Sequence, residues 1–568
     1  MRSSGHTGRI RLLWVLIAFA VVVYGARLYW LQVMRNETYA DQALHQYASA
    51  SGSVFDRGSI LFSDKNGGLT SAATLKSGFT LAINPSKISD INAAYETISS
   101  LISVDRALFF VRAEKKEDQY EEVARRLDEN TVDTIKAQEL PWMILSQEKW
   151  RYYPGATLAA HALGFVGYDG DVLSGRYGLE RYYEDALSRS NRDPYRNFLV
   201  DIFSTTKRGI TKGFEGDIVS AIEPKVQTAL EGELRGINEQ WSPDTIGGIV
   251  INPKSGAIYA MAVFPTFDPN TFSGEKDAGV FSNPVVESVF EMGSIIKPLT
   301  MAVGLDTGSV SADTTYNDEG TLVLNGSRIS NFDKKGRGKV NMQTVLNQSL
   351  NTGAVFVERK VGNARFAEYF RNLGLGEETG IDLPGETHGL IDNLNSPRDI
   401  EYATASFGQG IAMTPIETVR ALSALGNGGW LVTPHVAASI RYEGGITRSL
   451  TPEDRTRVFQ SSTSEEITRM LIKVFDEALL KGTVKMKNYS IAAKTGTAQM
   501  AREGGGGYYD DRYLHSFFGY FPAYDPQFLV FFFAVNPKGV QYASETLTHP
   551  FVAMAKFLIA YYQIPPDR

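Results

Sequence analysis

The sequence predicts an α+β protein in which one amino-terminal membrane-spanning helix precedes two further domains. Three observations support this fold class. A long uncharged apolar run begins at Leu12, the chain has 568 residues, and strand patterns separated by turns recur near its carboxyl end. A chain of this length exceeds one ordinary hydrophobic core, so more than one domain is expected. An antiparallel sheet flanked by helices would bury the apolar faces of such elements.

The membrane-spanning helix is predicted over residues 12–34. Residues 12–25 carry no charge, and Arg27 is the only interruption before Leu31. About 20 apolar residues suffice to cross the hydrocarbon of a bilayer. A cleaved signal peptide is the alternative. The apolar run is too long for an ordinary signal core, and the nearest small-x-small site, at residues 48–50, lies far beyond it.

The charges before the apolar run predict its orientation. Arg2, Arg9 and Arg11 precede it without any acidic residue. Because positively charged flanks stay in the cytoplasm, residues 1–11 are predicted to be a cytoplasmic tail. The rest of the chain is then expected on the periplasmic or extracellular side of the cytoplasmic membrane, as a single-pass protein.

Composition excludes several classes of function. Hydrophobic residues make up 43% and charged residues 21% of the chain, which is typical of a globular protein. The formal net charge is −7 without a block of Lys or Arg, so we expect no nucleic-acid partner. The chain has no cysteine, which excludes disulfides, thiolate metal sites and a cysteine nucleophile.

The histidines argue against another group of sites. The seven histidines are scattered singly, and none forms a His-x-x-x-His pair. A zinc site and a histidine-based triad are therefore disfavoured. We expect neither a metal nor an organic cofactor.

The chain beyond the anchor divides at about residue 210. Residues 35–210 mix helix and strand signals, include the amphipathic segment 115–127, and contain no catalytic constellation, so a spacer or docking domain is expected. The polar segment 205–213 is a plausible junction. Within residues 211–568, two strands are expected around the turn at 252–256, a helix is expected from Ser294 to about Gly308, and three strands are expected at 490–499, 515–521 and 528–535.

Ser294 and Lys297 have the spacing of a serine nucleophile and a lysine base. A serine hydroxyl is a weak nucleophile and needs an adjacent base. In a helix that begins near Gly293, residues three apart share one face, and the first backbone amides point outward unpaired. The spacing alone is not specific, since it also occurs at Ser146/Lys149, Ser204/Lys207 and Ser273/Lys276.

A lysine base must be neutral, so its pKa has to fall from about 10.4. Burial and a second nearby cation both lower it. Lys494 could be that cation, because it follows an apolar strand, and Gly496 would let a substrate backbone come close. Lys-Ser/Thr-Gly is a weak signal by itself and also occurs at Lys76 and Lys254.

A third element lies between these two. Ser349-Leu-Asn351 is the only Ser-x-Asn in the sequence. Ser-x-x-Lys, Ser-x-Asn and Lys-Thr-Gly in this order are a signature of serine β-lactamases and penicillin-binding proteins. Chance explains any one of these tripeptides more easily than it explains the ordered set.

With these motifs the sequence resembles the class B penicillin-binding proteins, which are monofunctional peptidoglycan D,D-transpeptidases, and most closely their FtsI and SpoVD branch. The likeness covers nearly the whole chain from the anchor onward. It includes segments 260–270, 379–386, 406–410 and 516–522, and more loosely 52–57, 164–170 and 178–180. It implies an elongated, dimerisation-like α+β pedestal at 35–210 and a transpeptidase domain with a serine β-lactamase-like fold at 211–568.

This chain departs from the family pattern at residues 186–192, which lack the usual glycines, and at three single positions. Ser51 stands where the first arginine of an Arg-Gly-x-Ile-x-Asp-Arg pattern is expected. Met292 stands where proline is frequent, and Ala493 where glycine is frequent. The last two substitutions keep the spacing of the motifs.

The resemblance implies catalytic roles for four residues. Ser294 would attack the D-Ala-D-Ala carbonyl of a stem peptide and become acylated, and Lys297 would remove its proton. Ser349, helped by Lys494, would relay a proton to the leaving D-alanine. An acceptor amine from a second stem peptide would then resolve the acyl-enzyme, and β-lactams would acylate the same serine.

The resemblance also implies a set of binding residues. Asn351 would bind the donor amide, and the hydroxyls of Thr495 and Thr497 would face the substrate carboxylate beside Gly496. The backbone amides of Ser294 and Thr497 would form the oxyanion hole. A polytopic glycosyltransferase of the FtsW kind and other division proteins are the implied protein partners, contacted through the anchor and the pedestal.

Several alternatives to a septal transpeptidase remain. The pattern leans toward division, but an elongation role in the same family is open. A class A β-lactamase would need a glutamate that activates a deacylating water, and no Glu-x-x-Leu-Asn follows Ser349. A β-lactam sensor would carry a multi-span signalling domain, which the sequence does not indicate. An inactive division scaffold is disfavoured because every catalytic position is intact.

Overall fold

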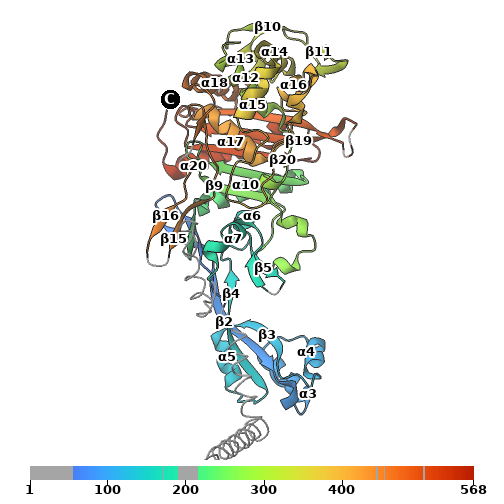
Figure 1. Cartoon of the computed structure of the whole chain (residues 1–568), viewed down its shortest axis with the longest axis vertical. Helices are drawn as coiled ribbons and strands as arrows, with labels where there is room; N and C mark the ends of the chain where they lie inside the picture. Colours follow the sequence, from blue (N-terminus) through green and yellow to red (C-terminus); the bar gives the residue numbers. More distant parts are fainter. Residues whose placement is uncertain are drawn as a thin grey trace, which may run out of the picture. The chain divides into compact units, whose positions relative to one another are not determined.

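The computed structural model describes residues 55–170, 172–189, 215–442, 445–452, 455–502, 504 and 506–568. The predicted tail and anchor at residues 1–34 and the predicted junction at 205–213 lie outside these residues. Between Phe55 and the carboxyl terminus, no described helix has both the length and the apolar character needed to cross a bilayer. The described chain forms two compact units (Figure 1): one holds residues 75–150, and the other holds residues 57–74, 151–189 and 215–568.

The smaller unit is an α+β structure with capped helices. Its helices are α3 (Ile91–Leu101), α4 (Arg106–Ala113) and α5 (Glu129–Lys136), and its strands are β3 (Glu121–Leu127) and parts of β2 (Leu69–Ile83) and β4 (Met143–Tyr152). The helices begin after Asp90, Asp105 and Asp128, whose carboxylates accept backbone N–H bonds of the first turn. Strand β3 covers the carboxyl-terminal half of the amphipathic segment 115–127.

A five-stranded antiparallel sheet forms the centre of the larger unit. Its strands, in spatial order, are β18 (Ala492–Ala501), β19 (Tyr508–Phe521), β20 (Phe528–Val535), β8 (Thr245–Ile251) and β9 (Ile258–Phe264). The three strands predicted near the carboxyl end and the two predicted around residues 252–256 are all confirmed. In that turn, Gly256 has φ +85° and its amide donates to the Asn252 carbonyl at 2.9 Å.

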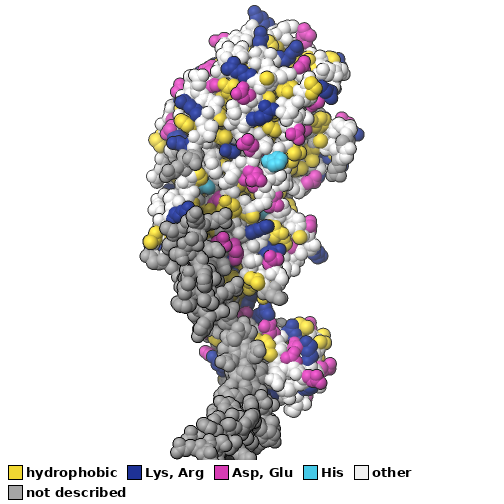
Figure 2. All heavy atoms as spheres, in the orientation of Figure 1, with side chains coloured by type: hydrophobic (Ala, Val, Ile, Leu, Met, Phe, Trp, Pro, Cys, Tyr) yellow, Lys and Arg dark blue, Asp and Glu magenta, His cyan; other side chains and the backbone are white. Residues whose placement is uncertain are grey.

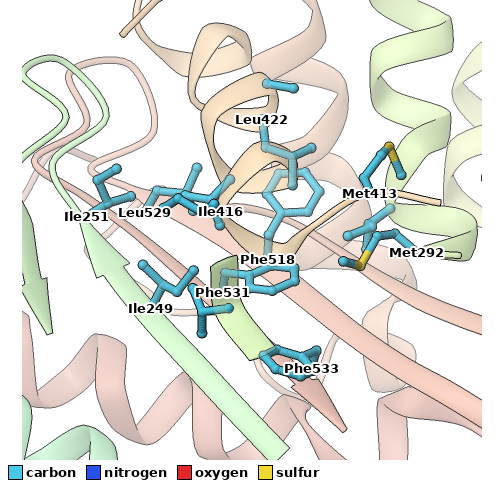
Figure 3. Packing of buried hydrophobic residues seen from close by; sticks show 14 of the residues in the cluster. Ile249, Ile251, Met292, Met413, Ile416, Leu422, Phe518, Leu529, Phe531 and Phe533 are labelled. Carbon is cyan, nitrogen blue, oxygen red and sulfur yellow. The ribbon is translucent and has the colours of Figure 1, made fainter. Parts of the chain in front are cut away.

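Alternating side chains of the sheet enter two separate cores. In β20, Val530 and Phe532 pack on one face against α10 (Pro224–Trp241) and α20 (Thr548–Tyr562). Leu529, Phe531 and Phe533 point to the other face, where they meet α17 (Pro415–Gly426) (Figure 3). A strand buried on both faces reads as a continuous apolar run, which explains the pattern of residues 528–535.

A helical region lies beyond this sheet at one end of the larger unit (Figure 1). Its helices are α12 (Lys297–Asp306), α13 (Met342–Asn347), α14 (Asn351–Val361), α15 (Asn363–Asn372), α16 (Asp399–Ala405) and α18 (Ser461–Lys473). Two hairpins accompany them, β10 (Thr315–Asp318) with β13 (Gly338–Asn341) and β11 (Thr321–Leu324) with β12 (Ser327–Ser330). The interface between this region and the sheet is where the sequence motifs meet.

A second group of strands in the larger unit consists of β16 (Thr447–Ser449), β15 (Ala437–Tyr442), β7 (Gly216–Ser220) and β1 (Ile60–Ser63). Short elements complete the unit: α6 (Ala160–Leu163), β5 (Val166–Asp169), β6 (Val172–Gly175), α7 (Gly178–Tyr182), α8 (Glu184–Leu187), α11 (Pro284–Glu287), β14 (Trp430–Leu431), β17 (Thr456–Arg457) and α19 (Ala543–Thr546).

Glu180 joins three distant segments of the larger unit. Its two carboxylate oxygens bind Arg57 Nε and Arg151 Nε, each at 2.6 Å, and all three side chains are buried. Burial favours the protonated carboxyl, but the charges of Arg151 and Arg57 hold the pKa of Glu180 below its ordinary value. The family-like segments that end at Arg57 and Glu180 therefore supply a buried ion-pair network.

Candidate active site

Ser294 lies at the start of a helix beneath the edge strand of the central sheet. The helix begins as a 3₁₀ turn, η5 (Gly293–Ile296), and continues as α12 to Asp306. This confirms the predicted start near Gly293 and the predicted end near Gly308. Gly293 has φ +63°, and its amide donates to the Gly408 carbonyl at 2.9 Å. Ser294 itself is half-buried.

Lys297 is one turn further along the same helix and is 1% exposed. Its Nζ donates to the Ser349 carbonyl at 2.5 Å and to Ser349 Oγ at 3.2 Å. The Ser294 hydroxyl makes no hydrogen bond within the described part of the chain. The lysine of the first motif is therefore bonded to the serine of the second.

Ser349 occupies the connection between α13 and α14. Its φ of +53° lies in the left-handed region, which costs a residue other than glycine about 1 kcal/mol or more. Its amide and the next one donate to the carbonyls of Leu346 and Val345, at 3.3 and 3.0 Å. These bonds hold the turn that directs Ser349 Oγ to Lys297 Nζ and, at 3.0 Å, to Lys494 Nζ.

Asn351 is the first residue of α14. Its side-chain nitrogen donates to the Ser330 carbonyl at 2.8 Å. Its side-chain oxygen accepts no hydrogen bond from any described residue. With the nitrogen already bonded, this oxygen is available to a donor outside the chain, such as the N–H of a peptide amide.

The third motif lies on β18, the edge strand of the central sheet. Lys494 is 3% exposed, and its Nζ donates to Ser349 Oγ at 3.0 Å and to the Thr495 carbonyl at 2.9 Å. The side chains of Thr495 and Thr497 lie on the face of the strand opposite to that of Lys494, and both are half-buried. Thr497 Oγ1 accepts a hydrogen bond from the Ala543 amide at 3.1 Å, so its proton remains available to an acceptor.

Gly496 is needed for packing inside the protein. A Cβ at this position would lie 2.3 Å from Ser516 Oγ and 2.8 Å from the Met292 carbonyl. The sequence suggested that this glycine admits a substrate backbone. In the structure, the chain segment that closely approaches Gly496 is the one leading into Ser294.

The exposed edge of β18 faces the start of the Ser294 helix. A Cβ on Gly293 would lie 3.1 Å from the Thr497 carbonyl oxygen, so this carbonyl points toward Gly293. In an antiparallel strand the N–H and C=O of one residue point to the same side. The Thr497 amide therefore points toward the same helix start, as an oxyanion hole made with the Ser294 amide would require.

Burial lowers the pKa of both lysines, and the neighbouring charge lowers that of Lys297 further. Burial, and then the charge of Lys494, hold the pKa of Lys297 well below its usual range. Burial lowers the pKa of Lys494 to about 7. Neither lysine forms an ion pair with a described carboxylate. The lowered pKa raises the fraction of Lys297 that is neutral and able to accept a proton.

The other Ser-x-x-Lys pairs have different surroundings. Ser273 and Lys276 are exposed. Ser146 and Lys149 lie on β4, where a spacing of three places side chains on opposite faces. Ser204 and Lys207 lie outside the described residues. Of the other Lys-Ser-Gly sites, Lys254 is on the turn between β8 and β9, and Lys76 is exposed on β2.

Three residues without an assigned role support the Ser294 turn. Ser516 Oγ donates to the Met292 carbonyl at 2.8 Å. Gly408 has φ +80°, and a Cβ there would lie 2.2 Å from the Gly293 carbonyl oxygen. Glu291 accepts hydrogen bonds from the Gly410 amide and the Tyr508 hydroxyl, both at 3.1 Å. The segments of Gly408 and Ser516 were predicted only to be family-like, because they lie more than 100 residues from Ser294 in the sequence.

The two frequent family residues that this chain lacks are accommodated. Met292 takes φ −76°, close to the value a proline would impose, and its buried side chain joins the cluster that contains Met413 and Phe518 (Figure 3). Ala493 is buried beside Gly519, where a Cβ on Gly519 would lie 3.0 Å from the Ala493 Cβ. Both positions keep their motif in place.

The surface and the remaining polar groups do not suggest a different chemistry. On the face shown in Figure 2, positive and negative side chains are interspersed over the described atoms. No cluster of three or more His, Asp or Glu side chains that could hold a metal ion is found among the described residues. The site is thus one serine at a helix start with two buried lysines on a neighbouring serine, which defines an acyl-transfer enzyme of the serine and lysine class.

Comparison with known proteins places the chain in a family. It belongs to the penicillin-binding proteins: residues 246–555 match the penicillin-binding protein transpeptidase domain, and residues 55–192 match the penicillin-binding protein dimerisation domain. The predicted resemblance and the predicted α+β transpeptidase fold are therefore confirmed.

Curated relatives extend over most of the chain. Stage V sporulation protein D of Bacillus subtilis is 29% identical over 97% of this chain and 85% of its own length. The peptidoglycan D,D-transpeptidase FtsI of Escherichia coli is 27% identical over 78% of this chain and 73% of its own.

Solved structures share the fold. Penicillin-binding protein 2X from Streptococcus thermophilus has a TM-score of 0.73 at 19% identity, covering 90% of this chain and 81% of its own. Penicillin-binding protein 3 from Mycobacterium tuberculosis, complexed with aztreonam, has a TM-score of 0.67 at 23% identity, covering 91% and 98%. With the family match and the curated relatives, the chain is a class B penicillin-binding protein and a serine-type peptidoglycan D,D-transpeptidase.

Proposed function

We propose that this protein cross-links peptidoglycan stem peptides during septal wall synthesis, through an acyl-enzyme on Ser294. The observation that carries the proposal is the convergence of two buried lysines on Ser349 Oγ, one of them from the same helix as Ser294. The septal assignment is supported by likeness to the FtsI and Stage V sporulation protein D relatives.

In the first step, Ser294 Oγ attacks the carbonyl carbon of the donor D-Ala-D-Ala bond. Lys297 takes the hydroxyl proton, which requires a neutral amine, and its lowered pKa supplies one. The oxyanion that forms is stabilised by the backbone amides of Ser294 and Thr497. Single donors of this kind typically contribute about 3 to 4 kcal/mol to the transition state.

In the second half of acylation, the C–N bond breaks and the leaving D-alanine amine needs a proton. Ser349 is suited to this transfer because its hydroxyl contacts both Lys297 and Lys494. Ser349 gives its proton to the amine and is reprotonated from a lysine. Because Ser349 is bonded to both lysines, one hydroxyl can relay protons between the two motifs.

Three side chains bind the donor peptide in this proposal. Asn351 offers its unbonded oxygen to the donor amide. Thr495 and Thr497 direct their hydroxyl protons to the terminal carboxylate, beside Gly496, and the Ala543 amide orients the Thr497 hydroxyl for this purpose. The amine of a second stem peptide then attacks the Ser294 ester and releases the cross-linked product.

The proposal extends to ligands, partners and location. β-Lactams acylate Ser294 in place of the donor; one relative of the same fold is described in complex with aztreonam. Residues 12–34 anchor the protein in the cytoplasmic membrane with residues 1–11 inside, residues 35–210 form the pedestal, and residues 211–568 form the transpeptidase domain. An FtsW-like glycosyltransferase and other division proteins contact the anchor and the pedestal.

Titration of the full-length protein in detergent with a fluorescent penicillin tests the chemical proposal. A long-lived adduct is expected on the wild type and none on Ser294→Ala. Ser273→Ala is the matched control, because it alters an exposed serine of another Ser-x-x-Lys pair and should label normally. Rapid turnover of the adduct would indicate a β-lactamase, and a wild type that does not label would indicate an inactive scaffold.

The septal assignment has a separate test. A fluorescent fusion of the full chain should concentrate at mid-cell. Uniform labelling of the side wall would assign the protein to elongation and leave the chemistry unchanged.

A further inference from the structure

A buried carboxylate in the helical region carries an unusual number of hydrogen bonds. Asp318, the last residue of β10, is 2% exposed. Its two oxygens accept hydrogen bonds from the Gly320 and Arg337 amides, each at 3.0 Å, from Asn331 Nδ2 at 3.0 Å to both oxygens, and from Thr352 Oγ1 at 2.7 Å. None of these groups belongs to the three catalytic motifs.

Asp318 is connected to Asn351 by the order of the chain. The Asn351 side chain is bonded to the Ser330 carbonyl. Thr352 follows Asn351, and Asn331 follows Ser330; both of these next residues are bonded to Asp318. One carboxylate therefore fixes the start of α14 and the end of β12 on either side of the Asn351–Ser330 bond.

Asn331 and Thr352, which both bind Asp318, are also bonded to each other. The Asn331 side-chain oxygen accepts a hydrogen bond from the Thr352 amide at 3.3 Å. The Asn331 side chain is thus oriented by Asp318 through its nitrogen and by Thr352 through its oxygen. Asp318, Asn331 and Thr352 are all at most 5% exposed, so water cannot easily reach them, and loss of these bonds would leave buried polar groups unsatisfied at a cost in free energy.

The same network reaches the other side of the second motif. The turn at residues 331–337 is bound to Asp318 at both ends, through Asn331 Nδ2 and the Arg337 amide. Arg337 Nε donates to Gln348 Oε1 at 2.9 Å, and Gln348 directly precedes Ser349. Asp318 therefore holds the surroundings of the second motif from two directions.

We propose that Asp318 is a positioning residue for Asn351, acting through Asn331, Thr352 and the Ser330 carbonyl. The inference rests on the proposed function, in which Asn351 binds the amide of the donor. Asp318 itself touches no substrate. It sets where the unbonded oxygen of Asn351 lies when the donor amide arrives.

Asp318→Asn is the sharpest perturbation because it keeps the shape of the side chain. An amide has one acceptor oxygen in place of two, and its NH₂ group would face the NH₂ of Asn331 or the Arg337 amide. Adding Asn331→Asp exchanges the two groups. The carboxylate at position 331 can then accept from the amide at 318 and keep the bond from the Thr352 amide.

The experiment compares two β-lactams on the full-length protein in detergent, one with an acylamino side chain and one without it. The acylamino amide takes the place of the donor amide that Asn351 binds. Asp318→Asn should acylate about tenfold more slowly than wild type with the first compound and at an unchanged rate with the second. The double variant Asp318→Asn/Asn331→Asp should regain most of the loss.

Glu319→Gln is the matched control. It removes a carboxylate from the residue next to Asp318, where the exposed Glu319 side chain is bonded to Asn317 and not to Asn331, Thr352 or Arg337. It should leave both acylation rates unchanged. A parallel Asn351→Ala variant reports on the proposed function, because it should lose the acylamino preference by itself.

The outcomes separate the two ideas. Equal slowing of both compounds in Asp318→Asn would show a general structural role and overturn the inference, as would unchanged rates with both. If Asn351→Ala keeps the acylamino preference, the assigned role of Asn351 is what fails. If Asp318→Asn does not fold, Thr352→Val, which removes the shortest bond to Asp318, decides the question: a selective loss supports the inference, and any other result overturns it.

Discussion

Replacing Lys494 with methionine should change the pH at which Ser294 becomes reactive. Lys297 Nζ and Lys494 Nζ lie 3.2 Å and 3.0 Å from the same Ser349 oxygen, so they are at most about 6 Å apart. At about 6 Å and an effective dielectric constant of about 20, two unit charges repel by about 2.8 kcal/mol. Methionine fills a similar volume without the charge.

The direction of the change follows from the charge on Lys297. A neighbouring cation disfavours protonation of Lys297, so removing that cation raises the pKa of Lys297. Acylation requires neutral Lys297, so the acid limb of the pH profile should move to higher pH. Burial still lowers the pKa of Lys297 in the variant, so its value should remain below that of an exposed lysine.

The assay measures the second-order rate constant of acylation of the full-length protein by a fluorescent penicillin, over the pH range in which the protein stays folded. The overall rate should also fall, because Lys494 has other contacts in the site, so the midpoint of the acid limb is the diagnostic quantity. Lys276→Met is the matched control, since Lys276 is exposed and belongs to a second Ser-x-x-Lys pair. An acid limb at the same pH in wild type and Lys494→Met would refute the electrostatic reasoning.

Two further predictions concern packing. Gly408→Ala places a Cβ 2.2 Å from the Gly293 carbonyl oxygen, whereas a Cβ at the control position Gly326, which has φ +79° against +80°, meets nothing within 4 Å. Both variants should lose about 1 kcal/mol of unfolding free energy to backbone strain. Only Gly408→Ala should lose about 1 to 3 kcal/mol more and acylate more slowly with penicillin. Glu180→Gln should lower the apparent unfolding free energy in urea by about 3 to 5 kcal/mol, because two buried guanidinium groups lose their carboxylate. Asp169→Asn, which breaks an exposed pair with Arg176, should cost less than about 1 kcal/mol, and equal losses in the two variants would contradict the argument.

Much of the larger unit could be predicted because its signals are local. The continuous apolar run at 528–535 became β20, a strand buried on both faces, and the turn at 252–256 became the connection between β8 and β9. The helix from Gly293 to Asp306 could also be predicted, because its apolar segment is followed directly by the residues that end it, up to Gly308. Periodicity and turn residues act over a few positions, so a single sequence displays them.

The supporting residues of the site could not be predicted in the same way. Gly408 and Ser516 contact the turn before Ser294 from segments more than 100 residues away. Gly496 was expected to let a substrate come close, and the structure adds that a Cβ there would meet the Met292 carbonyl and Ser516 Oγ. A glycine in a strand signals a close approach without revealing which group approaches.

By itself, the sequence determined the ordered motifs at Ser294, Ser349 and Lys494, and through them the class of enzyme, because motif spacing and order survive in the linear chain. Only the tertiary structure decided that Lys297 and Lys494 meet at one hydroxyl, and that burial together with their mutual repulsion lowers the pKa of Lys297. It also decided that Asp318 fixes the surroundings of Asn351. Desolvation and charge repulsion depend on which groups surround a side chain in space, and folding alone brings those groups together.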